Sequence, residues 1–299
     1  MPGALSESDR FPGVSTVFVV VPAHDEERVV QRGVRALLAD PSSDAHVLVV
    51  ANGCTDATAE RVRELRDPRV SVLELAEGGK ARAVRAGLSR SGTAQVVAVV
   101  DADVVLDDRV LPGLVHALAG DEPRIAAPSL ALELDGCSPL VRRYYRAWGR
   151  EPHVRTDDIG ARGIYAVNRA GLERVASMPD VIADDGWARA RFAPHERVVS
   201  AGTSTVRPAQ TLRAQVARRA RVLAGNRELR EVLPLSERPA PRVSTGVGPQ
   251  RTFGERLRED GAGDTAAWYA VEVPARLLTA WRRKRGRSTP WARDTTTRR

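Results

Sequence analysis

The sequence predicts an α/β fold in which helices flank a mostly parallel β-sheet. Short valine-rich runs alternate along the chain with segments whose apolar residues recur at helical spacing. The valine-rich runs lack polar alternation, which is typical of strands covered by helices on both faces. Strands and helices that alternate in this way form right-handed βαβ units, so consecutive strands are expected to run parallel.

The elements of the first 110 residues follow this pattern. The first strand is predicted over residues 15–23, where the chain reads STVFVVVPA without a charge. The segment after it, residues 27–39, places Val30, Val34 and Leu37 on one face of a helix. The same reasoning predicts further strands over residues 46–50, 69–75 and 95–100, and helices over residues 56–65 and 80–89.

The pattern is less regular after residue 125. Helices are predicted over residues 140–148, from residue 169 onward and over residues 211–232. Residues 236–263 are rich in proline, glycine and charge and show little periodicity, which predicts a linker. We therefore expect a flexible N-terminus over residues 1–14, one domain over residues 15–235, the linker, and a helical, basic, amphipathic C-terminal segment over residues 264–299.

Composition narrows the class of protein. Hydrophobic residues make up 42% of the chain, which is ordinary for a globular protein. Two cysteines, Cys54 and Cys137, give neither a disulfide framework nor metal-ligand spacing. The sequence shows no secretory signal and no apolar run near the roughly 20 residues that span a bilayer. These features predict a cytoplasmic enzyme.

The net charge of +8 belongs to one part of the chain. Residues 201–299 hold 21 basic and 9 acidic residues, whereas residues 1–200 hold 25 basic and 29 acidic residues. Proteins that bind nucleic acid by a basic surface combine it with interleaved aromatic residues, and that pattern is missing from the basic third. We therefore expect no nucleic-acid partner.

Four polar clusters follow the first four predicted strands: PAHDEE at residues 22–27, ANGCTD at 51–56, EGGKAR at 77–82 and DAD at 101–103. Each alone could be a turn or a helix cap. Ligands of an open parallel sheet bind beyond the carboxyl ends of its strands, so four consecutive clusters there are expected to converge on one crevice.

The chemistry of these clusters favours a nucleotide diphosphate with a divalent cation. Asp101 and Asp103 offer hard carboxylate oxygens that suit Mg²⁺ or Mn²⁺. The Gly78-Gly79 loop lets the backbone approach a ligand, and Lys80 adds a cation at the start of a helix. The two acids at the end of a buried strand are therefore predicted to be metal ligands.

The order VVVPAHDEE, VVANGCTDAT, EGGKARAVRAGL and VVDADVVLDD resembles family-2 glycosyltransferases, which are inverting, metal-dependent enzymes of the GT-A fold. The resemblance covers residues 15–230 and is strongest over residues 17–110. It implies a nucleotide-diphosphate-sugar donor and Mn²⁺ or Mg²⁺ held by Asp101 and Asp103. It also implies a donor site that includes Pro22, Ala23, His24, Glu26, Asn52, Gly53, Asp56, Lys80, Asp101 and Ala102.

The second motif departs from the family pattern. The family usually has Asp-Asp-Gly-Ser where this chain has Ala51-Asn52-Gly53-Cys54. Both acids are therefore replaced, which leaves the choice among UDP, GDP and dTDP open.

Two further segments carry expected roles. VIADDGWARARF resembles the site of the family's catalytic base, so the resemblance implies Asp185, or else Asp184, as the base; an acidic helix start is the alternative. QVARRARVLAGN resembles a helix that helps to bind diphosphate or acceptor, with Arg218 or Arg221 in that role. A solvated basic helix face is the alternative for the second segment.

Two other functions fit parts of this pattern. A sugar-1-phosphate nucleotidyltransferase has a glycine-rich, arginine-containing loop after its first strand, whereas PAHDEE is acidic and lacks glycine. A nucleotide-sugar-binding protein without catalysis is a further alternative, against which Asp184 and Asp185 argue. The acceptor hydroxyl is left open among a lipid carrier, a polysaccharide and a small metabolite.

The C-terminal segment has two interpretations. Trp268, Val271, Ala275, Leu278 and Trp281 fall on one helical face, interrupted at Pro274 and followed by residues 282–285, RRKR. Such a face suits an anionic membrane surface, which would place the protein peripherally on the inner face of a membrane. The alternative is a helix packed back on the main domain.

Overall fold

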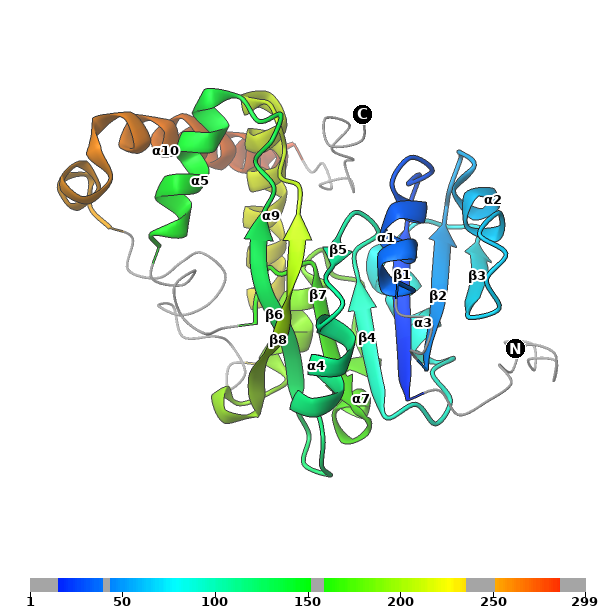
Figure 1. The fold of residues 1–299 in the computed structure, drawn as a ribbon. Helices are drawn as coiled ribbons and strands as arrows, with labels where there is room; N and C mark the ends of the chain where they lie inside the picture. The colour runs from blue at the N-terminus through cyan, green and yellow to red at the C-terminus, as the bar shows by residue number, and fades with distance from the viewer. Residues whose placement is uncertain (1–15, 40–43, 152–158, 235–250, 286–299) are drawn as a thin grey trace.

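The computed structural model describes residues 16–39, 44–151, 159–234 and 251–285, so the predicted flexible N-terminus lies outside the described residues. Figure 1 shows an eight-stranded sheet flanked by helices, as the sequence predicts. The strands are β1 (Val17–Ala23), β2 (Ala45–Asn52), β3 (Val70–Leu75), β4 (Val96–Val100), β5 (Val105–Leu106), β6 (Ile125–Leu132), β7 (Ile164–Asn168) and β8 (Arg197–Val206). The helices used below are α1 (Val30–Leu37), α2 (Thr58–Arg63), α3 (Lys80–Leu88), α4 (Val110–Ala117), α5 (Pro139–Gly149), α7 (Arg169–Ala176), α8 (Asp184–Ala190), α9 (Leu212–Val232) and α10 (Phe253–Lys284).

The sheet has the order β3-β2-β1-β4-β7-β6-β8-β5. The first four strands pair in parallel, as their alternation with helices predicts. β7 then enters antiparallel between β4 and β6, and β5 pairs antiparallel with β8. The sheet is therefore mixed, and the parallel half is the part whose carboxyl ends carry the four clusters.

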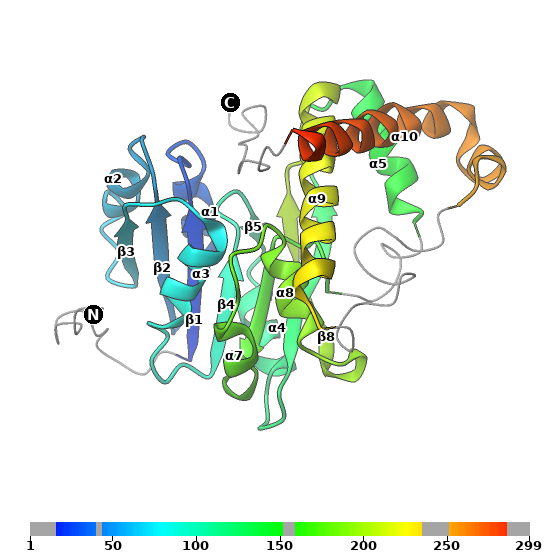
Figure 2. The same ribbon diagram turned by 180° about the vertical axis from the view of Figure 1, so that it is seen from behind.

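Two apolar layers cover the sheet because successive strand residues point to opposite faces. Val17, Val19 and Val21 of β1 face the layer that includes α1, α2 and α4. Phe18 and Val20 face the layer that includes α3, α7 and α8. Figures 1 and 2 show these helices on the two sides of the sheet.

Helix α3 lies unusually close to β1. Gly87 permits this approach, because a Cβ at that position would overlap the side chain of Val20. At the other end of α3, Lys80 is its first residue. The position of Lys80 is therefore set by a helix that is packed tightly against the central sheet.

The C-terminal region differs from the sequence prediction. Residues 253–263, assigned to the linker, form the start of α10; residues 236–250 and 286–299 lie outside the described residues. The helix continues through Pro274, and only Gly261 departs from helical dihedral angles. A linker boundary at residue 264 is thus wrong, since the helix starts at the Thr252–Glu255 capping box.

The apolar stripe predicted for a membrane packs instead against the protein. Trp268, Val271 and Ala275 are buried, and Tyr144 of α5 stacks on Trp268 at a centroid distance of 5.4 Å. Trp268 and Val271 form a third apolar cluster with residues of α5. The packed-back alternative is therefore correct for this part of the stripe.

Candidate functional site

The carboxyl ends of β1 and β2 are tied together by the side chain of Asn52. Its amide nitrogen donates to the carbonyl of Ala23 at 2.7 Å, and its amide oxygen accepts from the backbone nitrogen of Gly79 at 2.9 Å. Asn52 is fully buried. These bonds occupy the amide, so Asn52 fixes the loop before α3 rather than presenting its side chain to a ligand.

Gly53 and Gly78 bring two of the predicted clusters into contact. Gly53 has a φ of 58°, and a Cβ there would lie 2.5 Å from the backbone nitrogen of Gly78. His24 lies over the same loop, with its Nδ1 2.7 Å from the carbonyl oxygen of Asn52. The first three clusters therefore meet, as their positions at strand ends predict.

The other predicted donor-site residues of the first two clusters have local partners. Pro22 is buried in β1 in register with Val50. The backbone nitrogen of Glu26 donates to Thr58 Oγ1 at 2.7 Å, and Asp56 Oδ1 accepts from the backbone nitrogen of Thr58 at 3.0 Å. Asp56 thus stabilises the start of α2, which is the ordinary alternative for that residue.

One group of possible metal ligands lies in this turn. Oxygen or sulfur atoms of Asp25, Cys54 and Asp56 lie within 4.8 Å of one another. However, Asp25 Oδ1 accepts from the backbone nitrogens of Thr55 and Asp56 at 2.5 and 3.1 Å. Those bonds give Asp25 a structural role, since they hold a turn in which Asp25 itself has a φ of 52°.

Lys80 connects the third cluster to the two acid pairs. Its Nζ lies 2.6 Å from Asp101 Oδ1 and 2.8 Å from Asp184 Oδ1. Asp101 follows β4, whereas Asp184 opens α8, more than 80 residues further along the chain. The ammonium group therefore joins the end of the parallel sheet to the segment predicted to hold the base.

The charges at this junction perturb each other's titration. Burial raises the pKa of Asp184 and Lys80 lowers it, while Asp185 and Asp101 raise it, with a result of about 6. Burial lowers the pKa of Lys80, but Asp101, Asp184 and Asp185 outweigh burial and hold it above its ordinary value. Lys80 therefore stays charged. Asp184 lies near one positive neighbour, Lys80, and two negative neighbours, Asp101 and Asp185.

Tyr165 of β7 belongs to the same site and was not identified from the sequence. Burial raises the pKa of its hydroxyl well above the ordinary value, and the charges of Asp184, Asp185 and Asp101 raise it further. Its hydroxyl and Asp184 Oδ2 are buried without hydrogen-bond partners among the described residues. Tyr165 lies within residues 160–168, GARGIYAVN, but the sequence of this segment does not show that β7 lies beside β4.

The Asp101–Asp103 loop is supported on two sides. The backbone nitrogen of Asp101 donates to the carbonyl of Gly163 at 2.9 Å. A Cβ at Gly33 of α1 would lie 2.9 Å from the carbonyl oxygen of Ala102, so α1 touches the backbone of the loop. The predicted metal-binding segment is therefore held rigidly at the carboxyl end of β4.

Helix α9 brings a second cation to this loop. Arg218 donates to the hydroxyl of Tyr145 at 2.6 Å. Tyr145 raises the pKa of Arg218 and burial lowers it, and the charge of Asp103 raises it further. Arg221 is half-buried one turn further along α9. Arg218 therefore interacts electrostatically with the acidic loop.

The residues at this end of the sheet fit a divalent cation. Four carboxylates, Asp101, Asp103, Asp184 and Asp185, and two cations, Lys80 and Arg218, interact at this end of the sheet. Asp184 Oδ2 adds a buried oxygen without a hydrogen-bond partner among the described residues. Carboxylate oxygens are the ligands that Mg²⁺ and Mn²⁺ prefer, so the chemistry of the donor set suits a metal site.

Comparisons with solved structures show the fold. A mannosyltransferase from Pyrobaculum calidifontis, solved with GDP-Man and Mn²⁺, is 20% identical, with a TM-score of 0.55 over 93% of this chain and 82% of that chain. TarS from S. aureus is 15% identical, with a TM-score of 0.46 over 88% of this chain and 92% of that chain. Glucosyl-3-phosphoglycerate synthase from Mycobacterium tuberculosis, solved with Mn²⁺, UDP and glucosyl-3-phosphoglycerate, is 20% identical, with a TM-score of 0.43 over 66% of this chain and 70% of that chain.

Sequence comparison identifies the family. Among curated proteins, none matches this sequence significantly. The sequence profile described as glycosyl transferase family 2 matches residues 18–174, which is more than half of the chain and contains all four strand-end clusters. The chain therefore belongs to glycosyl transferase family 2 and is a glycosyltransferase of the GT-A fold.

Proposed function

We propose that this protein is a divalent-metal-dependent, inverting glycosyltransferase that moves a sugar from a nucleotide-diphosphate-sugar donor to an acceptor hydroxyl. The observation that carries the proposal is the position of Lys80 Nζ between Asp101 and Asp184, at 2.6 and 2.8 Å. This contact brings the proposed donor-binding acids and the proposed base segment into one site. The family match supports the same reaction class.

Asp101 and Asp103 are proposed to hold Mn²⁺ or Mg²⁺. When bound, the ion would neutralise charge that develops on the departing diphosphate. Lys80 orients Asp101 through its ion pair, and Arg218 adds a fixed positive charge near Asp103. Two cations of this chain thus lie where a diphosphate would need them.

Asp185 is proposed as the general base. Asp184 is 2% exposed and is held by Lys80, whereas Asp185 is partly exposed at the start of α8. A carboxylate at Asp185 would accept the proton of the acceptor hydroxyl. The acceptor oxygen would then form its bond to the anomeric carbon while the bond to the diphosphate breaks on the opposite face, which inverts the anomeric configuration.

The nucleotide and the acceptor class are not assigned by this proposal. The amide of Asn52 is engaged by backbone groups, so base selection would rest on neighbouring atoms of the first two clusters. Lipid-linked, polysaccharide and small-metabolite hydroxyls are all compatible with the proposed chemistry. Each is an acceptor class to be offered in transfer assays.

Thermal stability measured with UDP or GDP, with and without Mn²⁺, tests the donor site. A ligand at 100 times its Kd stabilises a protein by about 2.7 kcal/mol. Asp103→Asn is expected to abolish the Mn²⁺-dependent part of this stabilisation, because it removes a carboxylate ligand. Asp108→Asn, an exposed acid five residues further on, is the control and should keep it. Unchanged Mn²⁺-dependent stabilisation in folded Asp103→Asn would contradict the assignment.

We further propose a peripheral position at the cytoplasmic face of an anionic membrane. Within the described residues, no helix combines the length and apolar character that crossing a bilayer requires. Val273, Leu277 and Trp281 of α10 are 47%, 65% and 43% exposed and recur every four residues. Residues 282–285, RRKR, follow them directly. An exposed apolar stripe beside a basic cluster favours a membrane surface.

Liposome flotation tests the membrane proposal. Leu277→Ser/Trp281→Ser is expected to abolish salt-sensitive binding to anionic vesicles, because it removes the largest apolar side chains of the stripe. Val222→Ser/Leu257→Ser, which changes two exposed apolar residues elsewhere, should retain binding. Unmodified protein that stays in the soluble fraction at low salt would refute the proposal.

A further inference from the structure

A groove of about 330 Å³ lies between α9 and α10. Its walls carry Arg227 and Arg230 from α9 and Arg276 and Arg283 from α10. Leu223 and Ala280 contribute apolar surface between these walls. Leu223, Arg227 and Arg230 lie five, nine and twelve residues beyond Arg218, or about 8 to 18 Å along the helix axis, so the groove is separate from the acidic site.

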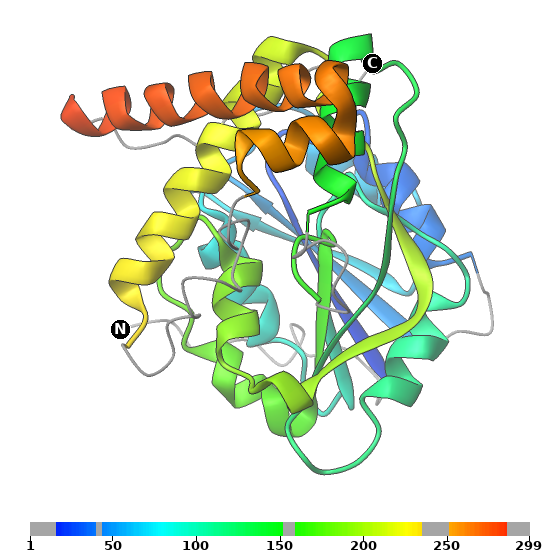
Figure 3. The same ribbon diagram turned by 90° about the vertical axis from the view of Figure 1, so that its left-hand side faces the viewer.

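The two helices that form the groove are fixed against each other. Figure 3 shows α10 crossing α9 and extending beyond it. Thr279 Oγ1 of α10 lies 3.2 Å from the carbonyl oxygen of Ala220 on α9. Arg219 of α9 pairs with Glu272 of α10 at 2.5 Å, with both side chains almost completely buried. These contacts hold the walls at a defined separation.

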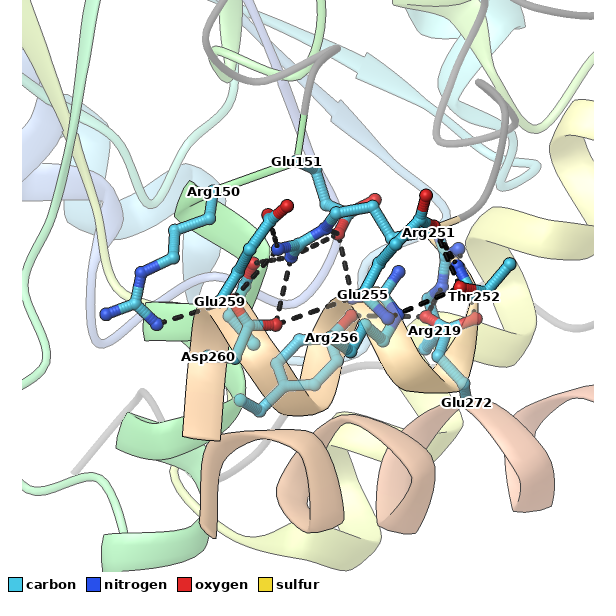
Figure 4. Close-up of polar contacts among 12 residues, drawn as sticks. Arg150, Glu151, Arg219, Arg251, Thr252, Glu255, Arg256, Glu259, Asp260 and Glu272 are labelled. Carbon is cyan, nitrogen blue, oxygen red and sulfur yellow. Dashed lines mark hydrogen bonds and ion pairs between the residues drawn. The ribbon is translucent and has the colours of Figure 1, made fainter. Parts of the chain in front are cut away.

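A second set of buried ion pairs anchors the start of α10. Figure 4 shows that Arg251, Arg256, Asp260 and Glu151 meet at the end of α5. Arg251 and Arg256 each lie 2.8 Å from Glu151, and Arg251 lies 2.9 Å from Asp260. The Arg256 guanidinium also lies 3.8 Å from the centre of the Trp268 ring. The helix that carries half of the groove is therefore well anchored in the absence of a ligand.

The arginines that line the groove have too few acidic partners to neutralise their positive charge. Arg227 pairs with Glu231 at 2.9 Å, and Arg276 lies 3.7 Å from Glu272, which is already paired with Arg219. In the part of the chain that the structure describes, no acidic residue lines the groove or pairs with Arg230 or Arg283. Because these four arginines line the groove without an acidic residue among them, their combined charge favours an anion there.

We propose that this groove binds the phosphate group of an organic phosphate, at a site distinct from the donor site. Guanidinium groups offer paired donors whose planar geometry matches phosphate oxygens. The apolar surface of Leu223 and Ala280 suits the carbon part of the same ligand and reduces competition from water. The phosphate could come from an anionic lipid headgroup or from a soluble phosphate ester, and both present the same group to the arginines.

Two probes test the groove in the full-length protein. The first is inorganic pyrophosphate, titrated by calorimetry without divalent metal. The second is a monomeric short-chain phosphatidic acid, titrated in the same way, so that the exposed stripe and the basic end of α10 meet no bilayer. Affinity for at least one probe is expected to fall about tenfold or more in Arg230→Gln/Arg283→Gln, because two charge-assisted contacts are lost. Binding of pyrophosphate identifies a soluble phosphate ligand, binding of the short-chain lipid alone identifies a lipid headgroup, and binding of neither probe would overturn the proposal.

Arg282→Gln/Lys284→Gln is the matched control, because it removes two charges from the same helical turn but leaves the groove lining intact. The control should weaken binding much less than the groove pair. Equal loss in both pairs, or no loss in the groove pair, would overturn the proposal. Mn²⁺-dependent nucleotide binding should be unchanged in Arg230→Gln/Arg283→Gln. A result against the groove can therefore be told apart from a result against the proposed donor site.

Discussion

Asp185→Asn is expected to lower the turnover number by about 10²–10⁴-fold while leaving donor affinity unchanged. The amide keeps the size of the side chain but cannot accept the proton of the attacking hydroxyl. Asp185 is the more exposed acid of its pair, and it has no ion pair to Lys80 comparable with that of Asp184. Transfer rates and donor affinity, measured separately, check this expectation.

Asp184→Asn serves as the comparison for that experiment. This change removes the partner of Lys80 and should affect stability as well as rate. A normal rate in Asp185→Asn together with a large loss of rate in stable Asp184→Asn would show that Asp184, and not Asp185, is the base. A loss of donor affinity in Asp185→Asn would show that the residue binds substrate rather than a proton.

Lys80→Met is expected to lower the free energy of unfolding by about 3–5 kcal/mol, because it leaves buried Asp184 without its counter-ion. Asp184 is 2% exposed and its second oxygen already lacks a hydrogen-bond partner in the described residues, so water cannot replace the ammonium group easily. Urea unfolding followed by circular dichroism measures the loss. Because removal of a cation raises the pKa of Asp184 further, the variant should be less destabilised at acidic pH than at neutral pH.

Two further variants isolate this effect. Lys80→Met/Asp184→Asn should recover part of the lost stability, because the buried charge is removed together with its partner. Arg82→Met lies two residues further along α3 and removes an exposed cation, which should change the free energy of unfolding much less. Equal effects of Lys80→Met and Arg82→Met would mean that the Lys80 contacts contribute little to folding.

The parallel half of the fold could be predicted because its pattern is local. Each valine run and each helical stripe between residues 17 and 100 identifies its own element, and the strands pair as their alternation requires. The antiparallel entry of β7 could not be predicted in this way. Its pairing with β4 places Val100 opposite Ile164, which are far apart in sequence. The pattern of a short apolar run predicts a strand but does not show which other strand it pairs with.

The C-terminal helix shows a second limit of periodicity. An apolar stripe predicts that a surface is covered, but not what covers it. Trp268 and Val271 are covered by α5, whereas Leu277 and Trp281 of the same helix remain exposed. The helix start was also missed, because Gly261 and the charged residues around it suggested a linker although the Thr252–Glu255 capping box begins a helix.

The candidate site was predictable in position but not in detail. Strand topology places the four clusters at one edge, since parallel strands share the direction of their carboxyl ends. The contact of Lys80 with Asp184 depends on the path of the chain after β7, which no local motif specifies. The side-chain amide of Asn52 likewise forms hydrogen bonds with Ala23 and Gly79. This orientation depends on the neighbouring strand and loop, so the sequence around Asn52 does not predict it.

The close packing of Gly87 on Val20 fixes one end of α3, and Lys80 begins the other end. Seven residues at 1.5 Å each separate Gly87 from Lys80, so the two positions are about 10 Å apart. A larger side chain at Gly87 would push α3 away from β1 and change the position of the Lys80 ammonium group. A substitution at Gly87 is therefore expected to disturb the contacts of Lys80 with Asp101 and Asp184 although all three residues are unchanged.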